Sequence, residues 1–227
     1  MLTAISLPKY NTILPISKEK VEFRPFTVKE SKVLMLAQEE ETSEATNDAI
    51  AQIISNCTFQ KHSIDTLNKI DAEYLFIQLR NKAMGEGVSV NGICKECGHK
   101  TPMMMNLENI VVTNTDEKLK PFKIMDNLWL ELKYPTMKDA MSVQTSDGNT
   151  AIAMSLAAVI TEDSVKVASE YTLQERIDFV ESLTELQLSA IKPFFDTFPI
   201  IVLDFKFPCK CGFENTVHIE GIENFFL

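Results

Sequence analysis

Two pairs of cysteines are the residues of this sequence whose type and spacing could do chemistry. Two residues separate Cys94 from Cys97, and one residue separates Cys209 from Cys211. Structural zinc takes four ligands in a tetrahedron, and four thiolates from two such pairs are a common set. The sequence therefore predicts that these four cysteines bind one zinc ion.

A glycine directly follows the second cysteine of each pair, so we expect each pair to lie in a tight turn between two strands. Gly98 and Gly212 tolerate the positive φ that such turns use, and the backbone amides can then point at the sulfurs. Each turn continues into a similar stretch, ending Leu-Glu at 107–108 and Ile-Glu at 219–220. We expect two related hairpins, each with a cysteine knuckle, that join as a zinc ribbon.

Two alternatives to this site stay open. A single residue between cysteines is a less common spacing than two, so the pairs can also be reduced thiols in turns. His99 or His218 can replace a cysteine as ligand, although His218 alternates with apolar neighbours and is expected to face away. A closed four-thiolate site leaves no position for water, so the expected role of zinc is to stabilise the fold.

Sequence motifs of catalysis are missing. There is no His-Glu-x-x-His sequence, no glycine-rich phosphate loop and no Gly-x-Ser-x-Gly elbow, and the three histidines are scattered. We therefore expect a protein that is not an enzyme. The fifth cysteine, Cys57, lies in an apolar helical pattern and is expected to be a small core residue.

Composition favours a folded protein that binds other proteins. The hydrophobic fraction of 45% is that of a globular chain, and no apolar run approaches the roughly 20 residues of a membrane span. The first residues lack the pattern of a signal peptide, so we expect the chain to fold in the cytoplasm of the cell that makes it. A net charge of −10 disfavours nucleic acid as a partner. Because the cysteine turns are locally basic, at Lys95, Lys100 and Lys210, a zinc-ribbon regulator that binds nucleic acid remains an alternative.

The distribution of apolar residues predicts an α+β fold, with helical layers that flank a small antiparallel β region. Four segments are expected: an N-terminal arm and helices (1–84), the first knuckle with a β segment (85–135), a second helical segment (136–199), and a C-terminal strand with the second knuckle (200–227). They would form one or two compact domains in which the knuckles at 94–97 and 209–211 are joined.

Local patterns predict individual elements within these segments. Before Val21 the chain is expected to be an irregular extended arm. Strands are predicted where apolar residues alternate, most clearly at 128–132 and 201–207. Helices are predicted after the capping boxes Thr27/Glu30, Thr172/Glu175 and Thr184/Gln187, at about 43–57 and 71–84, and over the nearly all-apolar run 149–160. Pro193 and Pro199 are expected to end the last helical stretch.

The stretch 23–32, Phe-Arg-Pro-Phe-Thr-Val-Lys-Glu-Ser-Lys, resembles a signature of the baseplate hub proteins of T4-type bacteriophages. In that family an Arg-Pro-Phe element precedes a helix that starts Val-Lys-Glu-Glu-Lys. The opening Leu-Pro pairs at 7–8 and 14–15, the strand 130–135 and the ending 219–226 are similar too, so the resemblance covers most of the chain. Ser31 stands where the family has a second glutamate, a departure that touches no chemistry.

The resemblance implies a structural component of the central baseplate hub of a contractile tail, or a chaperone outside the virion that helps to assemble the hub or the tape measure. Its partners would be other hub and tape-measure proteins, and a homo-oligomer within the hub fits this role. The chain would be found in the host cytoplasm during assembly and then in the tail baseplate. The apolar tail Phe225, Phe226 and Leu227 is predicted to contact partners, as is the arm before Val21; the alternative is that both dock on their own domain.

Overall fold

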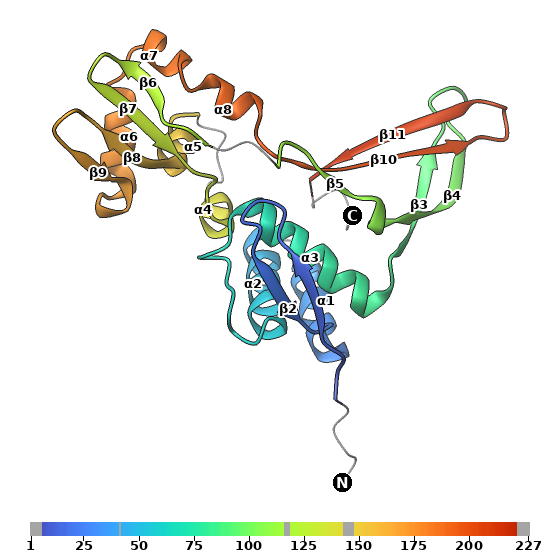
Figure 1. The fold of residues 1–227 in the computed structure, drawn as a ribbon. Helices are drawn as coiled ribbons and strands as arrows, with labels where there is room; N and C mark the ends of the chain where they lie inside the picture. Colours follow the sequence, from blue (N-terminus) through green and yellow to red (C-terminus); the bar gives the residue numbers. More distant parts are fainter. Residues whose placement is uncertain (1–5, 41, 116–118, 143–147, 222–227) are drawn as a thin grey trace. The chain divides into compact units, whose positions relative to one another are not determined.

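The computed structural model describes residues 6–40, 42–115, 119–142 and 148–221. The chain forms two compact units, each assembled from separate stretches (Figure 1). Helices and small antiparallel sheets are mixed in it, as the expected α+β class requires. None of the described helices is long and apolar enough to cross a membrane. The first unit comprises residues 1–63, 70–115 and 199–227, and the second comprises 64–69 and 116–198.

Three helices form the N-terminal part of the first unit: α1 (Val28–Glu39), α2 (Ser43–Cys57) and α3 (Lys69–Met84). They confirm the positions predicted from the sequence. Helix α3 has buried residues on all of its sides, among them Leu75, Phe76 and Leu79. A helix buried in this way lies in a core rather than on a surface. Cys57, at the end of α2, is fully buried, as expected for a core residue.

The segment before Val21 is not the irregular arm predicted from the sequence, because it contributes a strand. Leu14, in the turn of the resulting hairpin, is fully buried, so this part of the arm docks on its own unit. Asp71 of α3 accepts hydrogen bonds from the backbone amides of Ile16 and Ser17, at 2.8 and 2.9 Å. These partners are 54 and 55 residues away along the chain, so the local sequence carries no sign of them. The hairpin pairs β1 (Tyr10–Ile13) with β2 (Lys20–Phe23).

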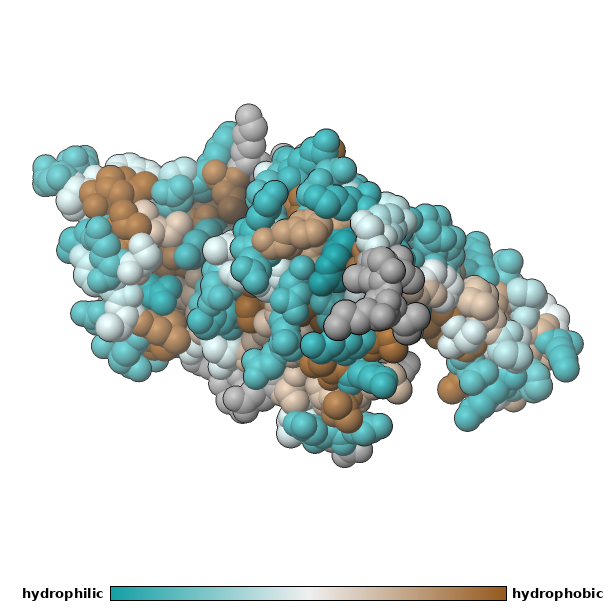
Figure 2. Space-filling model, turned by 90° about the horizontal axis from the view of Figure 1, so that it is seen from below, coloured by the Kyte–Doolittle hydropathy of each residue, from teal (hydrophilic) through white to brown (hydrophobic). Residues whose placement is uncertain are grey.

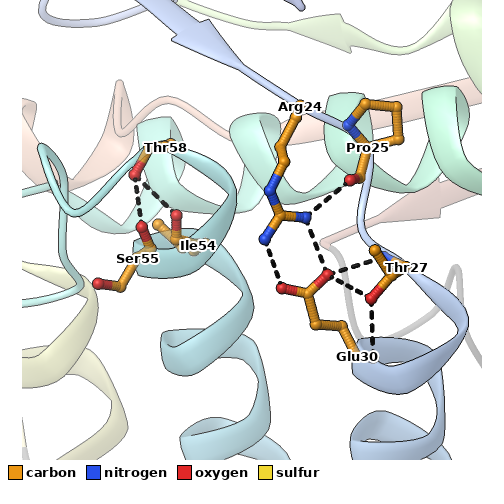
Figure 3. A network of polar contacts seen from close by, with 7 residues as sticks. All are labelled: Arg24, Pro25, Thr27, Glu30, Ile54, Ser55 and Thr58. Atoms are coloured by element: carbon orange, nitrogen blue, oxygen red, sulfur yellow. Dashed lines mark hydrogen bonds and ion pairs between the residues drawn. The ribbon is translucent and has the colours of Figure 1, made fainter. Parts of the chain in front are cut away.

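A partly buried ion pair connects the end of β2 to the start of α1. The two terminal nitrogens of Arg24 donate to the two carboxylate oxygens of Glu30, at 2.9 and 2.7 Å. Glu30 also accepts from the backbone amide of Thr27 at 2.7 Å, and Figure 3 shows the three side chains converging. The hydrogen bond from Arg24, together with those from Thr27, lowers the pKa of Glu30 to about 2. The backbone amide of Arg24 donates to the carbonyl of Cys57, which ties this junction to the end of α2.

Two β-hairpins complete the described part of the first unit. The first pairs β3 (Gly87–Ile93) with β4 (Lys100–Asn106), and the second pairs β10 (Ile201–Pro208) with β11 (Glu214–Glu220). A short strand, β5 (Val111–Val112), pairs with the other edge of β10, and a 3-10 turn (Leu107–Asn109) precedes it. Both hairpins keep a regular register along their whole length.

Gly92 lets the two hairpins approach closely. A Cβ atom at this position would lie 2.4 Å from Cε of Met103 and 2.6 Å from Cζ of Phe207. Met103 belongs to the neighbouring strand β4, whereas Phe207 belongs to β10 and is buried. Only glycine leaves room for the ring of Phe207 against β3.

The second unit is built around a four-stranded antiparallel sheet, in the order β6-β7-β8-β9. Its core combines Leu130, Leu132 and Leu156 of the sheet with Ile191 and Phe194 of the helical segment. The strands are β6 (Phe122–Met125), β7 (Leu128–Leu132), β8 (Leu156–Ile160) and β9 (Val165–Val167). The helices are α4 (Met137–Ser142), α5 (Gly148–Ser155), α6 (Leu173–Glu181), α7 (Glu185–Ser189) and α8 (Lys192–Asp196), and a 3-10 turn (Ala168–Glu170) follows β9.

The prediction of one long helix at 149–160 is wrong in its second half. The helix α5 ends at Ser155, and the next five residues form the inner strand β8. An inner strand is paired on both edges and buried, so it is as continuously apolar as a buried helix, and periodicity alone does not separate them. Pairing with β7 and β9 decides the conformation here.

The capping boxes of α6 and α7 are both present, which confirms two predicted helix starts. Thr172 accepts from the amide of Glu175, and Thr184 accepts from the amide of Gln187. Pro193, by contrast, does not end a helix. It lies in the first turn of α8, where the missing N–H of proline has no helical partner to lose.

Exposed apolar side chains are spread over several elements of both units. They include Val28 and Leu36 of α1, Met104 of β4 and Leu186 of α7. On the face in view in Figure 2, hydrophobic residues reach the surface in separate places, each bordered by hydrophilic ones. Scattered exposure of this kind is ordinary for a folded protein.

The Arg24–Glu30 pair gives a first prediction. Replacing Glu30 with Gln removes the charged partner of a guanidinium that is only partly exposed, and should lower the free energy of unfolding by about 2 kcal/mol. Because the folded-state pKa of Glu30 is depressed to about 2, its contribution is complete above its ordinary value of about 4.5 and is lost as the pH falls from there towards 2. The gap between wild type and variant, measured by urea unfolding, should therefore narrow over that range.

Glu175→Gln is the matched control for this prediction. Glu175 accepts the same two hydrogen bonds from its capping threonine, Thr172, at 2.8 Å each, but it is exposed and pairs with no arginine in the described structure. Equal destabilisation by both substitutions would contradict a special contribution of Arg24.

The close approach at Gly92 gives a second prediction. In Gly92→Ala the new methyl group must displace Met103 and Phe207, and overpacking of this kind destabilises by about 1–3 kcal/mol. Gly148→Ala, at a helical position where an added Cβ meets nothing within 4 Å, should be neutral or slightly stabilising. Thermal unfolding of the two variants compares them, and an unaffected Gly92→Ala would show that the hairpins do not need this contact.

Candidate metal centre

Each cysteine pair lies in the tight turn that closes one hairpin. In the first turn the amide of Cys94 donates to the carbonyl of His99, and that of Gly98 donates to the carbonyl of Cys94, both at 2.9 Å. In the second turn, the amides of Cys209 and Gly212 make the corresponding bonds at the same distance. The φ angles of Gly98 and Gly212 are +70° and +89°, as predicted for the glycine after each pair.

The hairpins bring the four cysteine sulfurs together, although 112 positions separate Cys97 from Cys209. The sulfurs of Cys94 and Cys211 are 3.7 Å apart, and those of Cys97 and Cys209 are 3.6 Å apart. All four lie within 4.8 Å of one another. These distances are far longer than the roughly 2.05 Å of a disulfide, and the cysteines are free thiols.

The spacing of the sulfurs fits a tetrahedral metal ion. Four sulfurs about 2.3 Å from a central zinc are about 3.8 Å from one another, which is the separation found across the two pairs. Each turn supplies one buried cysteine, Cys94 or Cys209, and one exposed cysteine, Cys97 or Cys211. The cluster could therefore hold a metal ion between the two turns, close to the surface. With four protein ligands in place, the ion would have no open position for a substrate.

Without a cation, the clustered thiols interact unfavourably when they ionise. Burial raises the pKa of the Cys94 thiol, but the nearby polar side chain of Asn215, backbone amides and the Cys209 thiol outweigh it, so its pKa falls to about 6. The thiol of Cys97 is stabilised as a thiolate by the backbone of His99, yet the adjacent sulfurs of Cys211 and Cys209 raise its pKa to about 12. The pKa of Cys94 is thus lowered while those of Cys97 and Cys211 are raised, a conflict that a bound cation would remove.

Asn215 is a part of this site that was not predicted from the sequence. It is 1% exposed, and its side-chain oxygen accepts a hydrogen bond of 2.9 Å from the backbone amide of Lys95 in the opposite turn. In the sequence, the feature that could have indicated it is the position of a polar residue on the apolar face of β11, two positions before Val217 and four before Ile219.

Neither candidate histidine belongs to the described cysteine cluster. His99 contributes a backbone carbonyl, and its residue is exposed. His218 lies on the outer face of β11, as expected, where its ring nitrogens are 2.6 Å from Asp204 and 2.8 Å from Glu220. The hydrogen bond with Asp204, and then that with Glu220, raises the pKa of His218. The predicted contact residues Phe225, Phe226 and Leu227 lie outside the described part of the chain.

Comparisons with known proteins give one match. Neither the curated proteins nor the solved structures contain a significant match to this chain. The family described as T4 bacteriophage base plate protein matches residues 7–227, which is nearly the whole sequence. The two hairpins, the cysteine cluster and the helical region all fall inside the match. The chain therefore belongs to the family of T4 bacteriophage base plate proteins.

Proposed function

We propose that this protein is a structural component of the central hub of a contractile-tail baseplate, and that it acts through contacts with other hub and tape-measure proteins during tail assembly. The observation that carries the proposal is the family match over residues 7–227. The hub, rather than another part of the baseplate, is favoured by the signature-like stretch 23–32. A net charge of −10 supports protein partners over nucleic acid.

The residues of that stretch have a structural role, which supports a non-enzymatic function. Arg24 and Glu30 form the partly buried ion pair at the start of α1, and Pro25 and Phe26 between them are buried. Thr27 completes the helix cap. The most recognisable part of the sequence thus builds the junction between a hairpin and a helix.

We further propose that the metal held by the four cysteines is zinc and that it stabilises the fold. Thiolates are soft ligands, and a tetrahedral set of four is typical of zinc in proteins that do not carry an iron–sulfur cluster. The ion would join two hairpins that are separated in the sequence by residues 116–198, the larger part of the second unit. Because ligand binding and folding are then coupled, removal of zinc should destabilise the first unit.

The hub proposal predicts that the protein stays in the particle. Quantitative mass spectrometry of purified baseplates should find this chain at a fixed small-integer ratio to the other hub subunits. If it is abundant in infected cells but absent from baseplates, the hub proposal is wrong and an assembly chaperone of the same system takes its place.

The zinc proposal predicts one zinc ion per chain in protein purified without chelator, measured by elemental analysis. Cys97→Ser, which replaces an exposed ligand, should lose the metal and lower the melting temperature. A strong chelator should lower the melting temperature of the wild type to a similar extent and leave that of Cys97→Ser unchanged.

Cys57→Ala provides the matched cysteine control. Cys57 is buried at the end of α2 and is not one of the four clustered cysteines. Its substitution should lower stability through lost packing while retaining one zinc per chain. Wild-type protein without bound metal, or with unchanged melting in chelator, would contradict the zinc proposal.

A further inference from the structure

Asn215 connects the two cysteine turns through its side chain. It is the second residue of β11, directly across the second hairpin from Phe207. Its oxygen accepts from the amide of Lys95, the residue that follows Cys94 in the first turn. The two partners are 120 positions apart, so this hydrogen bond ties one turn to the other.

The other end of the same side chain is an unsatisfied donor. The Nδ2 atom of Asn215 is buried and makes no hydrogen bond that meets ordinary distance and angle limits. A buried amide N–H without an acceptor is unfavourable, so such groups normally have a partner in the working state of a protein. The hydrogen bond of 2.9 Å from the amide of Lys95 holds this side chain against the first turn, next to Cys94.

A metal-bound thiolate is the acceptor that this donor lacks. A neutral thiol is a weak acceptor, whereas a thiolate that binds a metal keeps lone pairs and negative charge on sulfur. Polar groups that donate to ligand atoms orient those ligands and tune the metal, and their loss typically weakens metal binding about 10–100-fold. Asn215 has the right chemistry and burial for this role.

We infer that Asn215 is a positioning residue of the metal centre: its oxygen holds the first turn through Lys95, and its amide N–H donates to the sulfur of Cys94 when that sulfur binds the metal. This inference rests on the proposed metal site. One amide group thereby orients a ligand of the first hairpin from the second hairpin.

The test uses the full-length protein loaded with cobalt(II) and with zinc(II). Asn215→Asp keeps an oxygen for the amide of Lys95 but cannot donate to sulfur. Its zinc dissociation constant, measured by competition with a chelator of known affinity, should rise about 10–100-fold. Its sulfur-to-cobalt charge-transfer band should move to longer wavelength, because loss of the hydrogen bond raises the energy of the sulfur electrons. Asn215→Leu loses both contacts and should bind zinc no more tightly than Asn215→Asp.

Asn91→Asp is the charge-matched control. Asn91 is an exposed residue of β3, so its substitution adds the same negative charge to the hairpin region without touching the cysteines. It should retain the affinity and the spectrum of the wild type.

A measurement on the wild type keeps the inference testable if the variants do not fold. In protein loaded with ¹¹³Cd, nuclear magnetic resonance should detect a scalar coupling between the metal and a side-chain amide proton of Asn215, transmitted through the hydrogen bond to sulfur. A purely structural asparagine gives no such coupling.

The outcomes separate the two proposals. A wild type that binds neither cobalt nor zinc overturns the metal site itself, and this inference with it. A wild type that binds metal while Asn215→Asp keeps the wild-type affinity and spectrum overturns only the role of Asn215 as a donor. A loss of affinity confined to Asn215→Leu would likewise overturn the donor role and leave the contact with Lys95.

Discussion

Four sulfurs within 4.8 Å of one another are the constraint on which the hairpin region of the first unit depends. Thiolates at this separation repel one another, and the adjacent sulfurs of Cys211 and Cys209 raise the pKa of Cys97. The described contacts that hold the hairpins together are otherwise few and small: the packing of Phe207 on Gly92 and the hydrogen bond from Lys95 to Asn215. A bound cation would replace the repulsion between the sulfurs with bonds that join the two hairpins, and these would be the strongest connection between them.

In the helical part of the same unit, charged side chains removed from water are stabilised without a metal. Arg24 and Glu30 are charges taken partly out of water, and they are tolerated because each is satisfied by the other and by backbone groups. Asp71 is fully buried and is satisfied by two backbone amides of the β1–β2 turn. In both regions a polar group fixes the direction of the chain at a junction between elements, where apolar packing alone would allow several arrangements.

Local signals in the sequence were sufficient wherever the structure is decided locally. The cysteine spacing and Gly98 and Gly212 predicted both turns, and the threonine capping boxes predicted the starts of α1, α6 and α7. Local patterns did not predict the elements whose conformation depends on pairing with strands that are distant in the sequence. The run 149–160 divides into helix and strand because β7 and β9 flank its second half, and the strand β1 exists because β2 and Asp71 receive it. The role of Asn215 was not predicted because its partner, Lys95, is adjacent only in the folded chain.

The order of elements along the chain explains why the cysteine cluster lies where it does. The chain leaves the first unit after β5 and returns at β10, and these two strands are paired. Thr113 and Ile200 close this neck with hydrogen bonds of 3.0 and 3.1 Å. Only two residue pairs join β5 to β10, so this pairing is a weak link between the ends of the long segment that separates them.

A cross-link across a loop of about 100 residues removes chain entropy from the unfolded state worth roughly 4–5 kcal/mol. A metal that joined Cys94 and Cys97 to Cys209 and Cys211 would enclose the neck and residues 116–198 of the second unit in one such loop. With such a metal bound, the last hairpin would stay attached to the first even if the pairing of β5 with β10 were lost.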